Sequence, residues 1–237
     1  MGFECAARTH VGHRRKLNED SLFSSAERRL WAVADGMGGH HAGDVASRMI
    51  VDELARVSEG VSLDNSMGKA MAAIEMVNQD LVDLARKEHE HRTIGSTVVG
   101  LIADHAEYRC FWVGDSRAYR VRDGVIRRLT RDHSLVQDLI DAGMLDPAEA
   151  ETHPNANVVT RAVGATEALR IDSTGGAVMP GDTFLLASDG LTRLVGDDEL
   201  ARELSGNGLE AAADVLLELT LERGAPDNVS FILIRAA

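Results

Sequence analysis

Strand-like and helical segments are grouped along this chain and do not alternate, and this order constrains the fold more than any other feature of the sequence. Segments of strand-like composition lie at residues 3–11, 19–25, 30–35, 95–102, 108–113, 183–188 and 229–235. Helical periodicity follows residue 35 in two stretches, the second at roughly 65–90, and returns near 197–204 and 208–223. Runs of strands and runs of helices, without a repeated βαβ order, predict an α+β fold.

Two local patterns are explained by structure alone. Apolar side chains recur at helical spacing within 65–90, which predicts a face buried in the core rather than a binding surface. The side chains on this face are Met67, Ala70, Met71, Ile74, Val77, Leu81, Leu84 and Ala85. Asp123-Gly124 separates two strand-like segments, 119–122 and 125–128, which predicts a type I′ hairpin turn. Asp123 is therefore interpreted as a turn residue without a chemical role.

Composition argues against several classes of function. The chain carries 38 Asp and Glu against 25 Lys and Arg, a formal net charge of −13, which disfavours binding to nucleic acid. No apolar run reaches the length of a membrane span, and the N-terminus lacks the basic-then-apolar order of a signal peptide. We therefore expect a cytoplasmic protein without a membrane partner. Because repeats, low-complexity segments and linkers are absent, residues 1–237 are expected to form a single domain.

Carboxylates lie where five strand-like segments begin or end. The strings that contain them are Asn18-Glu19-Asp20, Val33-Ala34-Asp35-Gly36, Val113-Gly114-Asp115-Ser116-Arg117, Ala187-Ser188-Asp189-Gly190 and Pro226-Asp227-Asn228. One Asp-Gly after a strand is usually a turn, but five such strings in one chain favour a shared site. Oxygen ligands without a cluster of Cys or His indicate a hard cation such as Mg²⁺ or Mn²⁺. Two such cations, about 4 Å apart, would generate hydroxide and bind a phosphoryl group.

Seven motifs, in order along essentially the whole chain, carry a resemblance to one known family. They are Val11-Gly12…Arg15…Asn18-Glu19-Asp20-Ser21, Ala34-Asp35-Gly36-Met37-Gly38-Gly39-His40 with Gly43 and Ala46-Ser47, Gly95-Ser96-Thr97, Gly114-Asp115-Ser116-Arg117, Thr130-Arg131-Asp132-His133-Ser134, Ser188-Asp189-Gly190-Leu191 and Asp227-Asn228-Val229-Ser230. Together they resemble the bacterial form of the protein phosphatase 2C (PPM) family. This resemblance implies a central β-sandwich of two antiparallel sheets flanked by helix pairs.

The resemblance also implies a set of metal ligands. Asp35 is expected to bridge two Mn²⁺ or Mg²⁺ ions, with the Gly36 carbonyl on one of them. Asp189 and Asp227 are expected to hold the other ion, and Glu19 to support the first through water. Asp115 resembles the ligand of a third, weaker ion, which it would bind together with Asp189.

Three residues are expected to act in catalysis: Arg15, Asp20 and Asp35. By resemblance, Arg15 grips the substrate phosphate, because a guanidinium fork matches two phosphate oxygens. Asp20 orders metal-bound water. The implied reaction is in-line attack of a bridging hydroxide on a phosphoserine or phosphothreonine, without a phosphoenzyme.

The proton donor for the leaving group stays open. Eukaryotic members of the family carry a histidine directly after the Asp-Gly, and this chain has Met37 there. Metal-bound water is the first choice and His40 the second. His133 is interpreted as structural support. The segment 134–165 mixes short helical pieces with prolines and resembles the flap that lies beside the active site in this family.

Three functions remain to be compared. The first is a phosphatase, expected to be a monomer, that acts on phosphorylated proteins and reverses a bacterial Ser/Thr kinase. The second is a binding module of the same fold that has lost a metal ligand, although every expected ligand is present in this sequence. The third is a phosphatase dedicated to one regulatory partner, such as an anti-sigma-factor antagonist.

Overall fold

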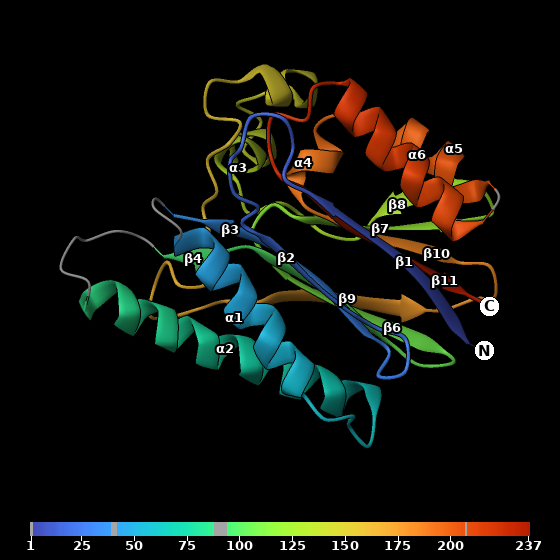
Figure 1. Cartoon of the computed structure of the whole chain (residues 1–237), viewed down its shortest axis with the longest axis horizontal. Coiled ribbons are helices and arrows are strands. Elements are labelled where there is room, and N and C mark those ends of the chain that lie inside the picture. Colours follow the sequence, from blue (N-terminus) through green and yellow to red (C-terminus); the bar gives the residue numbers. More distant parts are fainter. Residues whose placement is uncertain (1, 39–41, 88–93, 207) are drawn as a thin grey trace.

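The computed structural model describes residues 2–38, 42–87, 94–206 and 208–237, and its centre is a sandwich of two antiparallel sheets (Figure 1). One sheet has the order β1-β11-β10-β7-β8. Its strands are β1 (Phe3–His10), β11 (Val229–Ala236), β10 (Thr183–Ala187), β7 (Arg117–Arg122) and β8 (Val125–Arg128). The other has the order β2-β3-β5-β6-β9, and β4 pairs with β3. Its strands are β2 (Asp20–Ser25), β3 (Leu30–Met37), β4 (Gly95–Ser96), β5 (Val98–Ala103), β6 (Glu107–Val113) and β9 (Asp172–Ala177).

Helices cover the outer face of each sheet (Figure 1). α1 (Ala42–Arg56) and α2 (Leu63–Lys87) pack on the sheet that contains β3 and β5. α5 (Asp197–Ser205) and α6 (Leu209–Glu222) pack on the sheet that contains β10 and β11. A short helix, α4 (Asp189–Thr192), follows β10 directly. The predicted α+β fold with helix pairs outside a sandwich is confirmed.

Hydrophobic side chains form three layers, because successive residues of a strand point to opposite faces. Alternate residues of β11 show this: Phe231 and Leu233 pack under α6, whereas Ile232 and Ile234 pack between the sheets. The apolar stripe of α2 lies in the layer under the first helix pair, as predicted, with Ile74 and other members of the stripe buried. The sheets are thereby fixed relative to each other, and so are the loops at their ends.

The local predictions are confirmed at the hairpin and need correction at three other elements. Asp123 and Gly124 both have positive φ, 51° and 77°, as a type I′ turn between β7 and β8 requires. The segment 95–102 is not one strand, because β4 pairs with the end of β3 before Thr97 and β5 begins after it. Neither β9 nor α4 was predicted.

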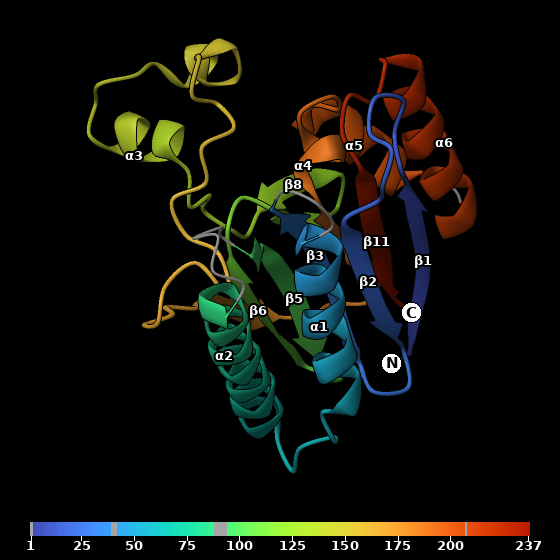
Figure 2. The same cartoon turned by 60° about the vertical axis from the view of Figure 1, so that its left-hand side comes forward.

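An excursion between β8 and β9 protrudes from the sandwich (Figure 2). It contains α3 (Leu135–Asp141) and the 3₁₀ helix η1 (Pro147–Thr152). We call the segment 134–165 the flap. Isolated β-bridges join Ser134 to Val159 within the flap and Val163 to Ser96 at its base. The segment is thus irregular, as the sequence predicts, and its base is attached to β4.

The first and last strands of the chain lie side by side in the same sheet. β1 and β11 pair antiparallel from Phe3 opposite Ala236 to His10 opposite Val229. The loop after β1 and the loop before β11 therefore meet at one end of the sandwich. In the described ranges, no helix is long and apolar enough to cross a bilayer.

Candidate active site

The acidic residues predicted to hold metal line one cavity at an end of the sandwich. The cavity has a volume of about 490 Å³. Its lining includes Arg15, Glu19, Asp35, Gly36, Asp115, Asp189 and Asp227. These residues come from loops and strand ends of both sheets, so only the assembled sandwich brings them together. Val158 and Val159 of the flap complete one wall.

Strand register places two of the acids opposite each other. Asp20 begins β2 and lies directly across from Asp35 near the end of β3. Like charges in such a cross-strand pair are destabilising unless a counter-charge is present. Ser188 donates a hydrogen bond from Oγ to Asp20 Oδ2 over 3.0 Å. The other oxygen, Oδ1, is buried and has no hydrogen-bond partner in the described part of the chain.

Close approach of backbone segments fixes the acid-bearing loops. A Cβ at Gly190, beside Asp189, would lie 1.9 Å from the Asn228 carbonyl oxygen. A Cβ at Gly36 would lie 2.1 Å from the Gly43 carbonyl oxygen. Neither distance is physically possible, so the glycines at these two positions are needed for the close packing of the backbone.

Asn228 ties the loop before β11 to the loop between β1 and β2 at three points. Its side-chain oxygen accepts a hydrogen bond from the backbone N–H of Glu19 over 2.8 Å. Its amide donates to the carbonyl oxygens of Val11, at 2.8 Å, and Leu17, at 3.0 Å. The loop that carries Arg15 and Glu19 is thus anchored to the residue that follows Asp227. The sequence motif contains Asn228, but its role could be assigned only from these contacts.

Burial and mutual repulsion raise the pKa values of the clustered carboxylates. Burial, followed by the charges of Asp20, Asp189, Asp115 and Asp227, raises the pKa of Asp35 well above its usual range. The pKa of Asp20 is raised to about 7, first by burial. The pKa of Asp115 is raised to about 7 by burial and then by Asp189. Such a cluster is stable in its charged form only with cations, and oxygen-only ligands fit Mg²⁺ or Mn²⁺.

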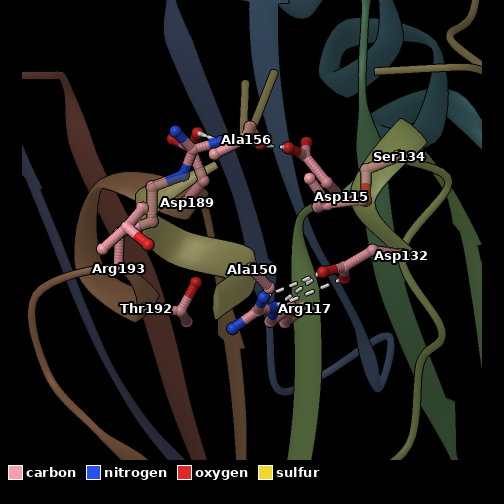
Figure 3. Close-up of a pocket in the computed structure, with 11 residues that line it drawn as sticks. Asp115, Arg117, Asp132, Ser134, Ala150, Ala156, Asp189, Thr192 and Arg193 are labelled. Atoms are coloured by element: carbon pink, nitrogen blue, oxygen red, sulfur yellow. Dashed lines mark hydrogen bonds and ion pairs between the residues drawn. The ribbon is translucent and has the colours of Figure 1, made fainter. Parts of the chain in front are cut away.

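Two arginines partly neutralise the cluster. Arg15 lies 2.7 Å from Asp227, measured from Nη2 to Oδ2. Arg193 lies 2.9 Å from Asp189 and 3.5 Å from Asp115, and Figure 3 shows its side chain among these residues. Within the described ranges, no three acidic, histidine or cysteine side chains converge tightly enough to hold an ion by themselves. Water molecules and the Gly36 carbonyl would therefore complete the ligand sets of the cations, and Arg15 would turn away from Asp227.

The remaining predicted residues divide into three cases. His133 supports the neighbouring loop, as predicted: its Nδ1 accepts a hydrogen bond from the Gly114 N–H over 3.0 Å, and its ring stacks on Trp112. Met37 lines the cavity. His40 lies outside the described residues.

Two further residues at the site were missed by sequence reasoning. Thr97 lines the cavity, and its Oγ1 accepts a hydrogen bond from the Asp35 N–H over 3.2 Å. Thr97 belongs to the motif Gly95-Ser96-Thr97, and this motif could have indicated that the residue lies near the site. Arg193 follows Asp189 by one helical turn, which is a spacing at which an ion pair can be expected.

Comparison with known proteins identifies the family. The model of the family described as Protein phosphatase 2C matches residues 9–214. The chain belongs to the protein phosphatase 2C family. This membership confirms the family named from the motifs.

Curated relatives match nearly the whole chain. Serine/threonine protein phosphatase PstP of Mycobacterium tuberculosis is 35% identical over 228 residues, which are 96% of this chain and 44% of the relative. Serine/threonine phosphatase stp of Listeria innocua is 34% identical over 235 residues, which are 96% of this chain and 93% of the relative. This phosphatase 2C chain thus spans less than half of the length of the first relative and nearly all of the second.

Solved structures share the fold. The structure of PppA, described as a key regulatory component of T6SS in Pseudomonas aeruginosa, superposes with a TM-score of 0.93 at 43% identity and covers 100% of this chain and 99% of its own. The catalytic domain of PstP in complex with 2 manganese ions superposes with a TM-score of 0.88 at 32% identity, covering 99% and 98%. These findings confirm the predicted fold and the predicted family.

Proposed function

We propose that this chain hydrolyses phosphoserine and phosphothreonine esters in proteins with two divalent cations. The observation that carries the proposal is the convergence of five carboxylates from both sheets in one cavity beside Arg15. An uncompensated acidic cluster of this kind would destabilise the fold, and cations offset the repulsion. The names of the curated relatives support the reaction class.

The residues fit two cations in the following way. Asp35 lines the cavity with the other acids, and burial, followed by the charges of four other aspartates, raises its pKa. We assign it as the bridging ligand, together with the Gly36 carbonyl. Asp189 and Asp227 are assigned to the second cation, and Glu19 to the first. When bound, two such cations lower the pKa of water and stabilise charge on phosphoryl oxygens.

Two other side chains would act directly on water and on the substrate. Asp20 lies beside Asp35, behind the cavity lining, and we assign it to ordering metal-bound water; Ser188 fixes its Oδ2, and its Oδ1 is buried. Arg15 has a side chain that is 51% exposed at the cavity mouth, so its guanidinium can turn from Asp227 to two phosphate oxygens. The phosphate is thereby oriented for in-line attack by water.

The proposal is tested with a phosphothreonine peptide and purified protein. Release of inorganic phosphate is measured with Mn²⁺, with Mg²⁺, with Ca²⁺ and with excess EDTA. We expect hydrolysis with Mn²⁺ or Mg²⁺ and none with EDTA, restored when Mn²⁺ is added back. Hydrolysis at an unchanged rate in EDTA would refute the metal-dependent reaction.

The partners and the cellular setting are part of the proposal. We infer that the substrates are phosphoproteins made by a bacterial Ser/Thr kinase, because the relatives are named as Ser/Thr phosphatases of bacteria. We also infer that residues 1–237 act as a single catalytic domain, as a monomer, and in the cytoplasm. Light scattering at micromolar concentration measures the molar mass in solution. A mass near that of a dimer would contradict the inferred monomer.

A further inference from the structure

Arg193 lies between the two aspartates for which the family resemblance implies a third, weaker ion. Its Nη2 is 2.9 Å from Asp189 Oδ2 and 3.5 Å from Asp115 Oδ2. Figure 3 shows an adjoining cavity that Asp115, Asp189 and Arg193 also line. In it, the guanidinium of Arg193 lies on the same side as Asp189, and Asp115 lies across from it. A single guanidinium therefore contacts both of the carboxylates on which the third ion would depend.

The backbone holds Arg193 in this place. It follows the helix α4, and its N–H donates to the Asp189 carbonyl over 3.0 Å. The two side chains are therefore one turn apart on the same face. Nη2 also donates to the carbonyl oxygen of Ala156 in the flap, at 3.4 Å. Nη2 therefore lies among two carboxylates and a flap carbonyl.

The surroundings make this ion pair stronger than one on the surface. The side chains of Asp115 and Asp189 are 8% and 17% exposed, and that of Arg193 is 32% exposed. Charges in such a partly dry setting interact more strongly than in water. A divalent cation between the same carboxylates would meet the positive guanidinium at close range, so the residues present do not fit a third ion.

We propose that the guanidinium of Arg193 takes the place of a third divalent cation between Asp115 and Asp189. The chain then binds two ions and keeps the neighbouring acids neutralised by its own side chain. This inference rests on the proposed function, because it assumes that the other carboxylates bind two ions.

The number of bound ions tests the inference directly. Mn²⁺ is titrated into the metal-stripped protein, and free Mn²⁺ is measured by electron paramagnetic resonance. We expect two ions in the wild type. Arg193→Ala should bind a third ion more weakly than the first two, and Arg193→Gln, which keeps most of the side-chain volume, should do the same. Asp115→Asn combined with Arg193→Ala should return the number to two.

Arg202→Ala is the matched control. Arg202 has a side chain that is 64% exposed and pairs with Glu203 on α5, away from the cavity. Its loss removes one positive charge from the molecule without touching the site, so two ions should still bind. Circular dichroism checks that each variant keeps the wild-type fold.

The outcomes separate the two proposals. Three ions in the wild type, or two ions in both the wild type and the folded Arg193 variants, would overturn the role of Arg193 and leave the proposed function in place. A wild type that binds no Mn²⁺ would refute the proposed function, and this inference with it.

Discussion

Asp189 lies where two neighbouring cavities meet. It lines the main cavity and a second cavity of about 300 Å³ that contains Arg117 and Asp132. Arg117 binds Asp132 through two of its nitrogens, so that carboxylate is already neutralised and is no candidate ligand. Asp189 has one arginine partner, Arg193, but burial and the neighbouring charge of Asp227 raise its pKa.

Asp189→Asn should lower kcat/KM for a phosphothreonine peptide by at least about 100-fold, because a ligand loses its charge. The amide has nearly the same volume as the carboxylate, so the fold should remain. Phosphate release and circular dichroism measure the two effects. Activity at the wild-type rate in a folded variant would contradict the metal assignment.

Arg15→Ala should raise KM for phosphoprotein by about 10- to 100-fold, with a smaller effect on kcat, because a charge-assisted contact to phosphate is lost. Arg14→Ala is the matched control, since Arg14 is exposed and does not line the cavity. Steady-state kinetics on one phosphoprotein compare the variants. Equal KM values for the two would show that another residue holds the phosphate.

For single residues, the sequence predicts which side chains line the site but not which contacts position them. Glu19, Asp35 and Asp227 were chosen from motifs, and they line one cavity. The contacts of Asn228 with Leu17 and of Arg193 with Asp115 join residues far apart in the sequence, so no local pattern could reveal them. The proton donor also stays open, since His40 lies outside the described residues.

The flap is the element that the sequence describes least, and a buried side chain of α2 helps to hold its base. Asn78 of α2 is 1% exposed and accepts a hydrogen bond from the Gly164 N–H over 2.7 Å. Its amide donates to the Thr166 carbonyl over 2.9 Å. The segment that leads back from the flap to β9 is thereby fixed to the helix.

Asn78→Ala should lower the free energy of unfolding by about 1–3 kcal/mol, because buried backbone groups at Gly164 and Thr166 lose their partner. Gln79→Ala is the control on the same helix: Gln79 is exposed, and its loss should cost within about 0.5 kcal/mol. Urea unfolding measures both. Faster proteolysis of the flap in the first variant would agree, and equal stability of the two variants would contradict the role of Asn78.

The elements that were missed have weak local signals. β9 has the sequence Asp-Ser-Thr-Gly-Gly-Ala, with two glycines and little apolar surface, and it forms only because it pairs with β6 at the edge of the sheet. The break at Thr97 follows from tertiary contacts as well, since its N–H donates to the Asp35 carbonyl. The long strands β1 and β11 were predicted within a few residues.

For the whole molecule, the acidic cluster links stability to pH and to metal. The folded-state pKa values of Asp20 and Asp115, about 7, lie above the unfolded value of about 4. Folding therefore favours the protonated acids, so their contribution is fully present below about pH 4 and is lost as the pH rises through about 7.

In EDTA, the melting temperature should accordingly fall as the pH is raised through this range, and Asp20→Asn should flatten the fall. Mn²⁺ at about 100 times its dissociation constant should raise the melting temperature by about 5–10 °C above pH 7, because a ligand that binds only the folded state stabilises it. Calorimetry over the pH range measures this. A melting temperature that rises with pH in EDTA would contradict the electrostatic account.

The pairing of β1 with β11 has a consequence for when the site can form during synthesis of the chain. Synthesis proceeds from the N-terminus, so Asp227, Asn228 and β11 leave the ribosome after every other acid of the cavity. Until then, the loop that carries Arg15 and Glu19 lacks its hydrogen bonds to Asn228. A polypeptide that ends before residue 227 would lack the Asp227 carboxylate and the Asn228 contacts that anchor the loop of Arg15, so under the proposed function it would be inactive.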